Sequence, residues 1–249
     1  MRGERGKRSD RFMSRLIATL FYITIVTLCI ITISCGLPTT EYLYPPAIFS
    51  STGGVLVIEH DKRNIDEPDV SSIFQGYEIY YRVFDDQNEA EQSYYDIRNM
   101  TSSNVIQTAN NYQYYPLKHR IFASGQFSLD ISPLIKANDD NTYYAKYNLN
   151  MDTQGTWTLT DEGSNPVIDS IVRNRSDTAS SADIVKADFY LSSEYKVGDR
   201  DYAGTISSPS SVYIVFFAFA YGFDPSTMKN VYSDPVIILE PIEYSPGGT

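Results

Sequence analysis

The chain has 249 residues, with 31 acidic against 20 basic side chains and a formal net charge of −11 at pH 7. This balance excludes the broad basic surface that nucleic acids and anionic lipid surfaces require, so we expect neither as a partner. The positive charge is gathered instead at the amino terminus, where residues 1–15 contain six basic and two acidic side chains.

Residues 1–34 are typical of a signal peptide, because the basic start is followed by an uncharged, mostly apolar segment from Leu16 to Ser34. The segment has 19 residues. That length also suits a membrane span, which needs roughly 20 residues, whereas a signal peptide core usually has about 7 to 15. An uncleaved membrane anchor and simple secretion therefore stay open as alternatives. A start at Met13 would give a signal peptide of ordinary size, with residues 1–12 as an upstream extension.

Small residues flank a cysteine where the apolar segment ends, in the order Ile33, Ser34, Cys35 and Gly36. This stretch resembles the lipobox of bacterial lipoproteins, although Thr32 stands where that pattern usually has leucine. The resemblance implies cleavage between Ser34 and Cys35, lipidation of the Cys35 thiol and acylation of the new amino terminus by a fatty acid such as palmitate. It also implies a place in the bacterial cell envelope, anchored by lipid on the outer face of a membrane and either periplasmic or surface-exposed.

Cleavage at this point would leave a mature chain without disulfides. The only other cysteine, Cys29, lies in the segment removed, and it follows the bulky Leu28, which makes it a poor lipidation site. Residues 35–46 contain three prolines and no apolar periodicity, so we interpret them as a lipidated terminus and tether of at most about 40 Å. The mature chain of 215 residues, 35–249, with a net charge of −15, is long enough for a core that needs no disulfide.

From Ala47 onward the pattern is predominantly β, with short runs of β-branched and aromatic residues separated by turn residues. The strongest predicted strands cover residues 53–61, 76–84, 141–151, 155–160, 185–195, 211–221 and 231–241. Within 141–151, one set of alternate positions is mostly apolar, which predicts a strand buried on one face. This set is Tyr143, Ala145, Tyr147, Leu149 and Met151, which alternate with Thr142, Tyr144, Lys146, Asn148 and Asn150.

One segment has helical spacing. Asp86 followed by Glu89 resembles a capping box, and Ala90, Tyr94 and Ile97 then recur at helical intervals. We therefore predict a helix from about residue 87, and a second short helix within residues 102–111.

Two blocks, "FQGYEIYYRVFDD" at residues 74–86 and "SSVYIVFFAFAYGFDPSTMKNVYSDPVIIL" at 210–239, resemble strands of fibronectin type III domains. The resemblance implies a mostly β fold, an antiparallel β-sandwich over residues 47–249 with a long insertion at about 86–205 that contains a short helix and extra strands. It places Tyr213 where such sandwiches cap the penultimate strand. The tryptophan expected on the second strand is missing, because Trp157 lies elsewhere. The insertion must fold onto the sandwich or form a small domain.

The sequence contains no recognisable catalytic, cofactor or metal site. Ser-x-x-Lys occurs at residues 193–196 and 226–229 without its companion motifs. The two histidines, His60 and His119, lie in different segments, which leaves too few nitrogen donors for zinc. The acidic turns at residues 139–140 and 199–201 could offer oxygen atoms to calcium, although such sequences are more often simple turns.

The abundance of tyrosine is the remaining sequence feature that bears on function, and 20 of the 21 tyrosines lie in the mature chain, residues 35–249. Neighbours such as Tyr114 and Tyr115 point to opposite faces of a strand, so some should be exposed and suited to protein or glycan binding. We therefore expect a non-enzymatic, lipid-anchored binding or structural module. An envelope hydrolase or transferase with a dispersed acidic site and a structural subunit of an envelope complex are the alternatives.

Overall fold

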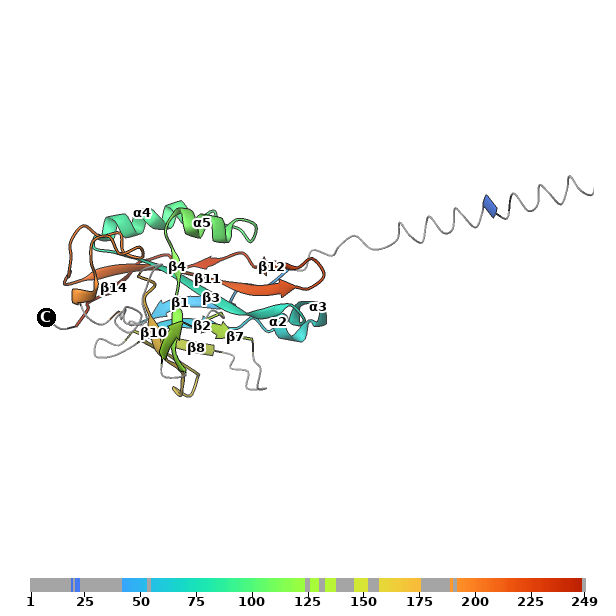
Figure 1. The fold of residues 1–249 in the computed structure, drawn as a ribbon, viewed down its shortest axis with the longest axis horizontal. Helices are drawn as coiled ribbons and strands as arrows, with labels where there is room; N and C mark the ends of the chain where they lie inside the picture. The colour runs from blue at the N-terminus through green and yellow to red at the C-terminus, as the bar shows by residue number, and fades with distance from the viewer. Residues whose placement is uncertain are drawn as a thin grey trace, which may run out of the picture. The chain divides into compact units, whose positions relative to one another are not determined.

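The computed structural model describes residues 19, 21–22, 42–52, 55–123, 126–129, 133–137, 146–151, 157–175, 189 and 192–247. Residues 41–249 belong to one compact unit. The strands described below all lie in this unit and form two antiparallel sheets, which confirms the predicted mostly β, sandwich-type fold (Figure 1).

The first sheet, called sheet 1 here, has seven strands in the order β1-β2-β8-β9-β10-β5-β6. Their bounds are β1 Ile48–Thr52, β2 Val55–Glu59, β5 Lys118–Ala123, β6 Gln126–Leu129, β8 Lys146–Asn150, β9 Trp157–Thr160 and β10 Pro166–Val172. In β8 the predicted alternation is confirmed, since Tyr147 and Leu149 are buried while Lys146, Asn148 and Asn150 are partly exposed. The expected insertion is therefore integral to the fold, because β8, β9 and β10 extend the β1-β2 pair directly.

Sheet 2 is built around the order β12-β11-β3-β4, with β7, β13 and β14 pairing at its margins. Its strands are β3 Phe74–Phe84, β4 Tyr115–Pro116, β7 Ile135–Lys136, β11 Val212–Asp224, β12 Lys229–Tyr232, β13 Val236–Ile237 and β14 Ile242–Tyr244. The two blocks that carry the family resemblance are direct neighbours here, since β3 pairs with β11 from Phe74 to Phe84.

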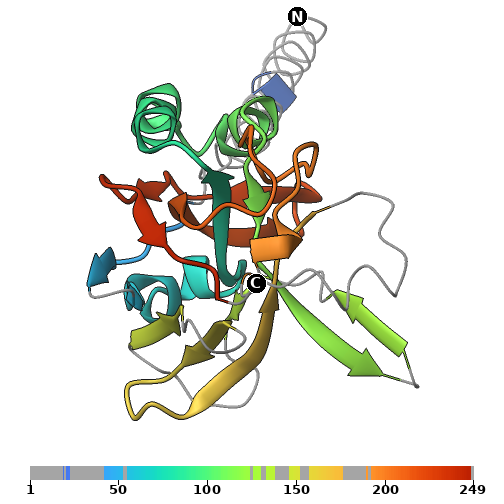
Figure 2. The ribbon, with the colours of Figure 1, turned by 90° about the vertical axis from the view of Figure 1, so that its left-hand side faces the viewer.

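Helices α4 Gln87–Ile97 and α5 Val105–Asn111 form a helix layer over the face of sheet 2 that points away from sheet 1 (Figure 2). The two short helices, α2 Arg63–Asp66 and α3 Pro68–Ser71, are not part of this layer, since Ile65 and Val70 pack into the core between the sheets. Along β11, Ile214 and Phe216 face sheet 1, whereas Val215, Phe217 and Phe219 pack beneath α4 and α5. This strand is apolar on both faces because both are covered, which explains the unbroken run "VYIVFFAFA".

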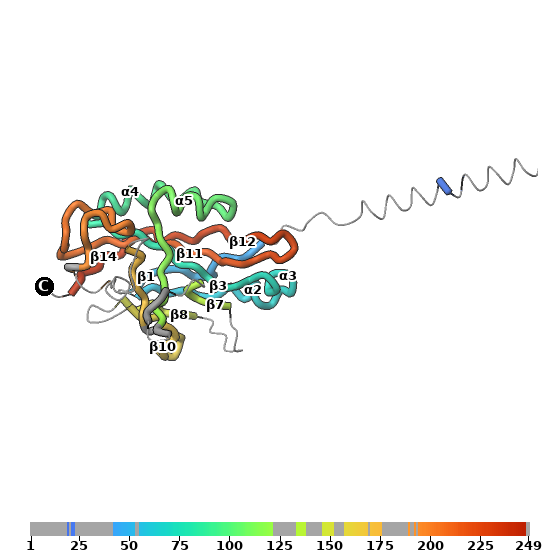
Figure 3. The backbone as a smooth tube through the Cα atoms, in the orientation of Figure 1, coloured from blue at the N-terminus to red at the C-terminus, as the bar shows by residue number. Residues whose placement is uncertain are grey.

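The chain returns along β11 in three short pieces (Figure 3). The single strand predicted over residues 231–241 is therefore wrong: the structure contains β12, β13 and β14. Pro235 and Pro241 lack the N–H that a continuous ladder needs, and both stand at the breaks. At the first break the Ser233 hydroxyl accepts a hydrogen bond from the Ala220 N–H at 2.9 Å in place of a backbone acceptor.

The strand predicted at 185–195 is also wrong where the structure describes it. Residues Ser192–Glu194 form a short 3-10 helix. The cause is side-chain bonding: the Arg173 guanidinium donates to the Glu194 carbonyl at 2.7 Å, and Arg175 pairs with the Glu194 carboxylate. The remainder of that prediction, apart from Phe189 and Tyr195, lies outside the described residues.

Both predicted helices are confirmed. In α4 the Asp86 carboxylate accepts a hydrogen bond from the Glu89 N–H at 3.0 Å, which is the cap that the sequence indicated. Ala90 and Ile97 are buried against sheet 2, whereas Tyr94 is only half-buried and Ser93 takes the third inward position.

Removal of this cap provides a test of the helix layer. We expect Asp86→Ala to lower the free energy of unfolding by about 1 kcal/mol, because the Glu89 N–H loses its acceptor. Urea denaturation measures the change. Asp86→Asn keeps a capping oxygen and should stay within about 0.5 kcal/mol of the original protein. Equal losses in both variants would show that the carboxylate acts through its charge and not as a cap.

Candidate functional site

The lipidation site expected at Ser34 and Cys35 lies outside the described residues, as do Asp139 and Asp140. Among the residues that the structure does describe, no helix has the length and apolar character to span a membrane. Lipidation of Cys35 therefore stays a sequence prediction, and the side chains described below belong to the folded unit of residues 41–249.

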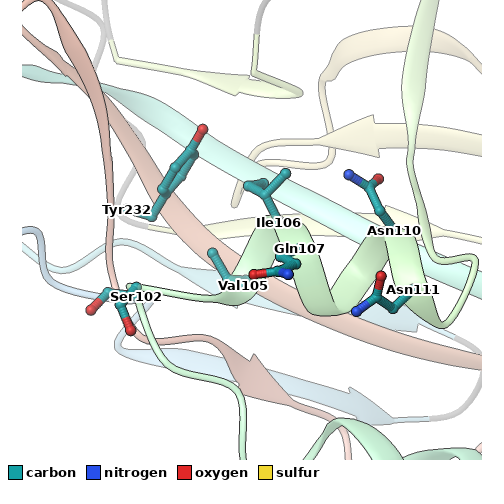
Figure 4. Close-up of a pocket in the computed structure, with 8 residues that line it drawn as sticks. Ser102, Val105, Ile106, Gln107, Asn110, Asn111 and Tyr232 are labelled. Carbon is teal, nitrogen blue, oxygen red and sulfur yellow. The ribbon is translucent and has the colours of Figure 1, made fainter.

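A groove of about 500 Å³ lies between α5 and β12 (Figure 4). Its lining consists of Ser102, Ser103, Val105, Ile106, Gln107, Asn110, Asn111 and Tyr232. The volume falls within the range of about 300 to 1,000 Å³ that is usual for ligand pockets. Its wall combines hydroxyl groups, carboxamides, two aliphatic side chains and one aromatic ring, and none of the lining side chains carries a formal charge.

Local structure holds α5 in place beside the groove. The Asn104 side chain accepts a hydrogen bond from the Thr101 N–H at 2.7 Å and closes the turn before the helix. The Ser102 N–H donates to the Asp234 carboxylate at 2.7 Å, which ties this turn to the segment after β12. Val105 and Ala109 are buried against sheet 2, so the helix is fixed from below.

Tyr232 forms the aromatic side of the groove. Its ring meets Phe219 edge-on with centroids 5.7 Å apart, and Tyr221 lies at 5.9 Å. The ring is only half-buried, and Ile106 approaches from the helix. Packing on one side therefore orients an aromatic surface that is still accessible on the other.

A buried cluster of charged side chains around Arg173 has a structural role. Arg173, directly after β10, makes a bidentate ion pair with Asp201, with nitrogen–oxygen distances of 3.0 and 2.8 Å, and both side chains are fully buried. The Tyr81 hydroxyl donates to the same carboxylate at 2.5 Å, and the Tyr195 ring lies 4.1 Å from the guanidinium carbon. Although burial alone would lower the pKa of Arg173, the Asp201 carboxylate holds it above the ordinary value.

The acids of the turn at residues 199–201, which could have offered oxygen atoms to calcium, are paired with arginines. Asp199 contacts Arg173 at 3.4 Å and Arg175 at 3.3 Å, so both acids of the turn face guanidinium groups and not a cation site. Within the described residues no group of histidine, cysteine and acidic side chains has the arrangement of a metal site. The calcium interpretation of this turn is therefore replaced by a buried salt-bridge cluster.

The two histidines lie apart, as the sequence indicated. His119 is in β5 opposite Ile171, whereas His60 follows β2 and is buried against Phe74 and Tyr77. The Tyr77 hydroxyl lies 3.1 Å from His60 Nδ1 and accepts hydrogen bonds from the Asp61 N–H and the Asn64 amide, each at 3.0 Å. Burial lowers the pKa of His60 to about 4.

The Ser-x-x-Lys matches gain no support from their surroundings. Ser226 and Lys229 are exposed at the β11–β12 turn, where the Asp224 carboxylate accepts hydrogen bonds from the Ser226 N–H and the Thr227 hydroxyl. Ser193 lies in the short 3-10 helix. Ser226 is not among the residues that line the groove.

No family model, curated protein or solved structure matches this chain. Sequence reasoning missed the groove because its two walls are far apart in the chain, from Ser102 to Asn111 on one side and Tyr232 on the other. The run "SSNVIQTANN" indicated a helix, and its many amides were the one available signal of a polar surface.

Proposed function

We propose that this protein is a non-enzymatic cell-envelope protein, anchored through lipid on Cys35, that holds a ligand-binding domain close to the membrane surface. The observation that carries the proposal is the junction at residues 33–36, where small residues flank a cysteine directly after an apolar segment and before a proline-marked tether. Two or three acyl chains bind a membrane firmly, since each buried methylene contributes about 0.8 kcal/mol.

The groove beside α5 supports the binding part of the proposal. Its lining offers hydrogen-bonding groups and an aromatic ring but no charged side chain and no histidine. General acid–base catalysis needs a group with a pKa near the working pH. The lining contains no histidine, carboxylate, lysine or cysteine, the groups that usually fill this role. The arrangement therefore favours recognition over catalysis.

Metabolic labelling with a fatty-acid probe tests the anchor. We expect the original protein to incorporate label and Cys35→Ala to lose it completely, because the acceptor thiol is gone. Cys29→Ala is the matched control, since it removes the only other cysteine, and it should label normally. Label retained in Cys35→Ala, or lost only in Cys29→Ala, would contradict lipidation at Cys35.

A further inference from the structure

The side-chain amides that line the groove are not used to hold the fold together. Two neighbouring amides have structural partners, since Asn104 caps the turn and Gln113 accepts a hydrogen bond from Arg82 at 3.1 Å. By contrast, within the part of the chain that the structure describes, the side-chain amides of Gln107, Asn110 and Asn111 make no hydrogen bond. Their donors and acceptors are therefore available to a ligand.

The uncharged polar groups of the lining favour an uncharged ligand over a charged one. A carboxamide presents two donors and an acceptor without formal charge, and the serine hydroxyls also act both ways. Asp234, a carboxylate beside the groove, already accepts a hydrogen bond from the Ser102 N–H. The chain as a whole carries a net charge of −11, which repels phosphates and acidic ligands. A ligand that fits is uncharged and rich in groups that both donate and accept.

The aromatic side of the groove adds a second requirement. Tyr232 is fixed by Phe219 and Tyr221 and presents an apolar surface, with Ile106 on the helix side. Figure 4 shows the amides of α5 along the same groove as this ring. A sugar ring matches the pairing, because its C–H face packs on an aromatic ring while its hydroxyl edge bonds to amides.

We propose that the groove between α5 and β12 binds an uncharged oligosaccharide, with Tyr232 as the stacking platform and Gln107, Asn110 and Asn111 as hydrogen-bonding groups. This inference rests on the proposed binding function and names its ligand class. The groove volume of about 500 Å³ accommodates a few sugar units, and both ends of a longer oligosaccharide would extend into solvent.

Titration of the full-length protein with neutral trisaccharides tests the inference. Maltotriose, cellotriose and chitotriose are the probes, trigalacturonate is the charged comparison, and a zwitterionic detergent avoids competition from sugar headgroups. By calorimetry or saturation-transfer NMR, we expect at least one neutral trisaccharide to bind in the millimolar range or more tightly. Trigalacturonate should bind more weakly than that sugar.

Single substitutions then test whether the sugar binds in the groove. Tyr232→Ala should weaken it about tenfold or more, which corresponds to about 1.4 kcal/mol. Gln107→Ala changes an exposed side chain, so it leaves the fold intact and should weaken binding about two- to fivefold. Tyr95→Ala, at an exposed tyrosine of α4 outside the groove lining, is the matched control and should leave binding unchanged.

Several outcomes would overturn the inference: no neutral trisaccharide binds, trigalacturonate binds better, or Tyr232→Ala and Gln107→Ala bind as the original does. Binding of mixed-sequence peptides at Tyr232, with no binding of sugars, would replace it with a peptide site. Failure here is separable from failure of the anchor. A protein that is labelled at Cys35 but binds no sugar disproves only the ligand class, and a protein that binds sugar without lipid disproves only the anchor.

Discussion

Arg173→Met should lower the free energy of unfolding by about 3 to 5 kcal/mol, the largest effect that we expect from a single substitution. Methionine keeps much of the side-chain volume, but the Asp201 carboxylate then stays fully buried without its guanidinium partner. The substitution also removes the bond to the Glu194 carbonyl that holds the 3-10 helix. Urea denaturation at neutral pH measures the loss.

Two further variants separate ion pairing from packing. Arg175→Met removes a guanidinium that is one-fifth exposed, and its loss should be smaller than that of Arg173→Met, because Glu194 and Asp199 keep some contact with water. Asp201→Leu combined with Arg173→Met leaves no uncompensated charge, so the double variant should be more stable than Arg173→Met alone. If Arg173→Met proves no more harmful than Arg175→Met, the buried pair does not stabilise the fold as the structure indicates.

Stability should fall by roughly 2 to 3 kcal/mol when the pH is lowered from about 7.5 to about 4.5, because of His60 alone. In the unfolded chain this histidine takes a proton near pH 6.5. In the folded protein burial holds its pKa at about 4. Between these two pKa values the unfolded state binds a proton at this histidine and the folded state does not. The contribution of neutral His60 to the free energy of unfolding is therefore full above about pH 6.5 and is lost as the pH falls toward 4.

His60→Gln isolates this effect, because glutamine stays neutral and its side-chain carbonyl can still accept a hydrogen bond from the Tyr77 hydroxyl. Two polar groups beside His60 are the Tyr77 hydroxyl and the Asp61 carbonyl. Hydrogen bonds from Arg63 lower the pKa of the Asp61 carboxyl, so this group does not titrate within the window. Urea midpoints at the two pH values should differ less in His60→Gln than in the original protein. A slope unchanged by His60→Gln would contradict the lowered pKa.

Local patterns in the sequence were enough to predict the elements whose environment is simple. The alternation at Tyr147 and Leu149 indicated one buried face, and the Asp86–Glu89 spacing indicated a cap, because both depend on neighbouring residues. Residues 185–195 failed as a strand where described, because the bonds that shape Ser192–Glu194 come from Arg173 and Arg175. Such tertiary bonds leave no local pattern.

The candidate site was less predictable than the fold for the same reason. Tyr232 and Asn110 are separated by more than a hundred residues, and the β12–β11 pairing brings one wall of the groove beside α5. Charge patterning did indicate acids at residues 199–201, but the arginines that neutralise them come from another segment. Cys35 could be predicted as a site from the sequence alone, because the lipobox pattern consists of adjacent residues.

The intact mass of the mature protein, purified from its native membrane, tests the lipid anchor most directly. We expect a mass that corresponds to a chain beginning at Cys35 and carrying a diacylglyceryl group, with or without a further acyl chain on the amino terminus. A mature protein that retains residues before Cys35, or that begins at Cys35 without lipid, would contradict the anchor on which the proposed function depends.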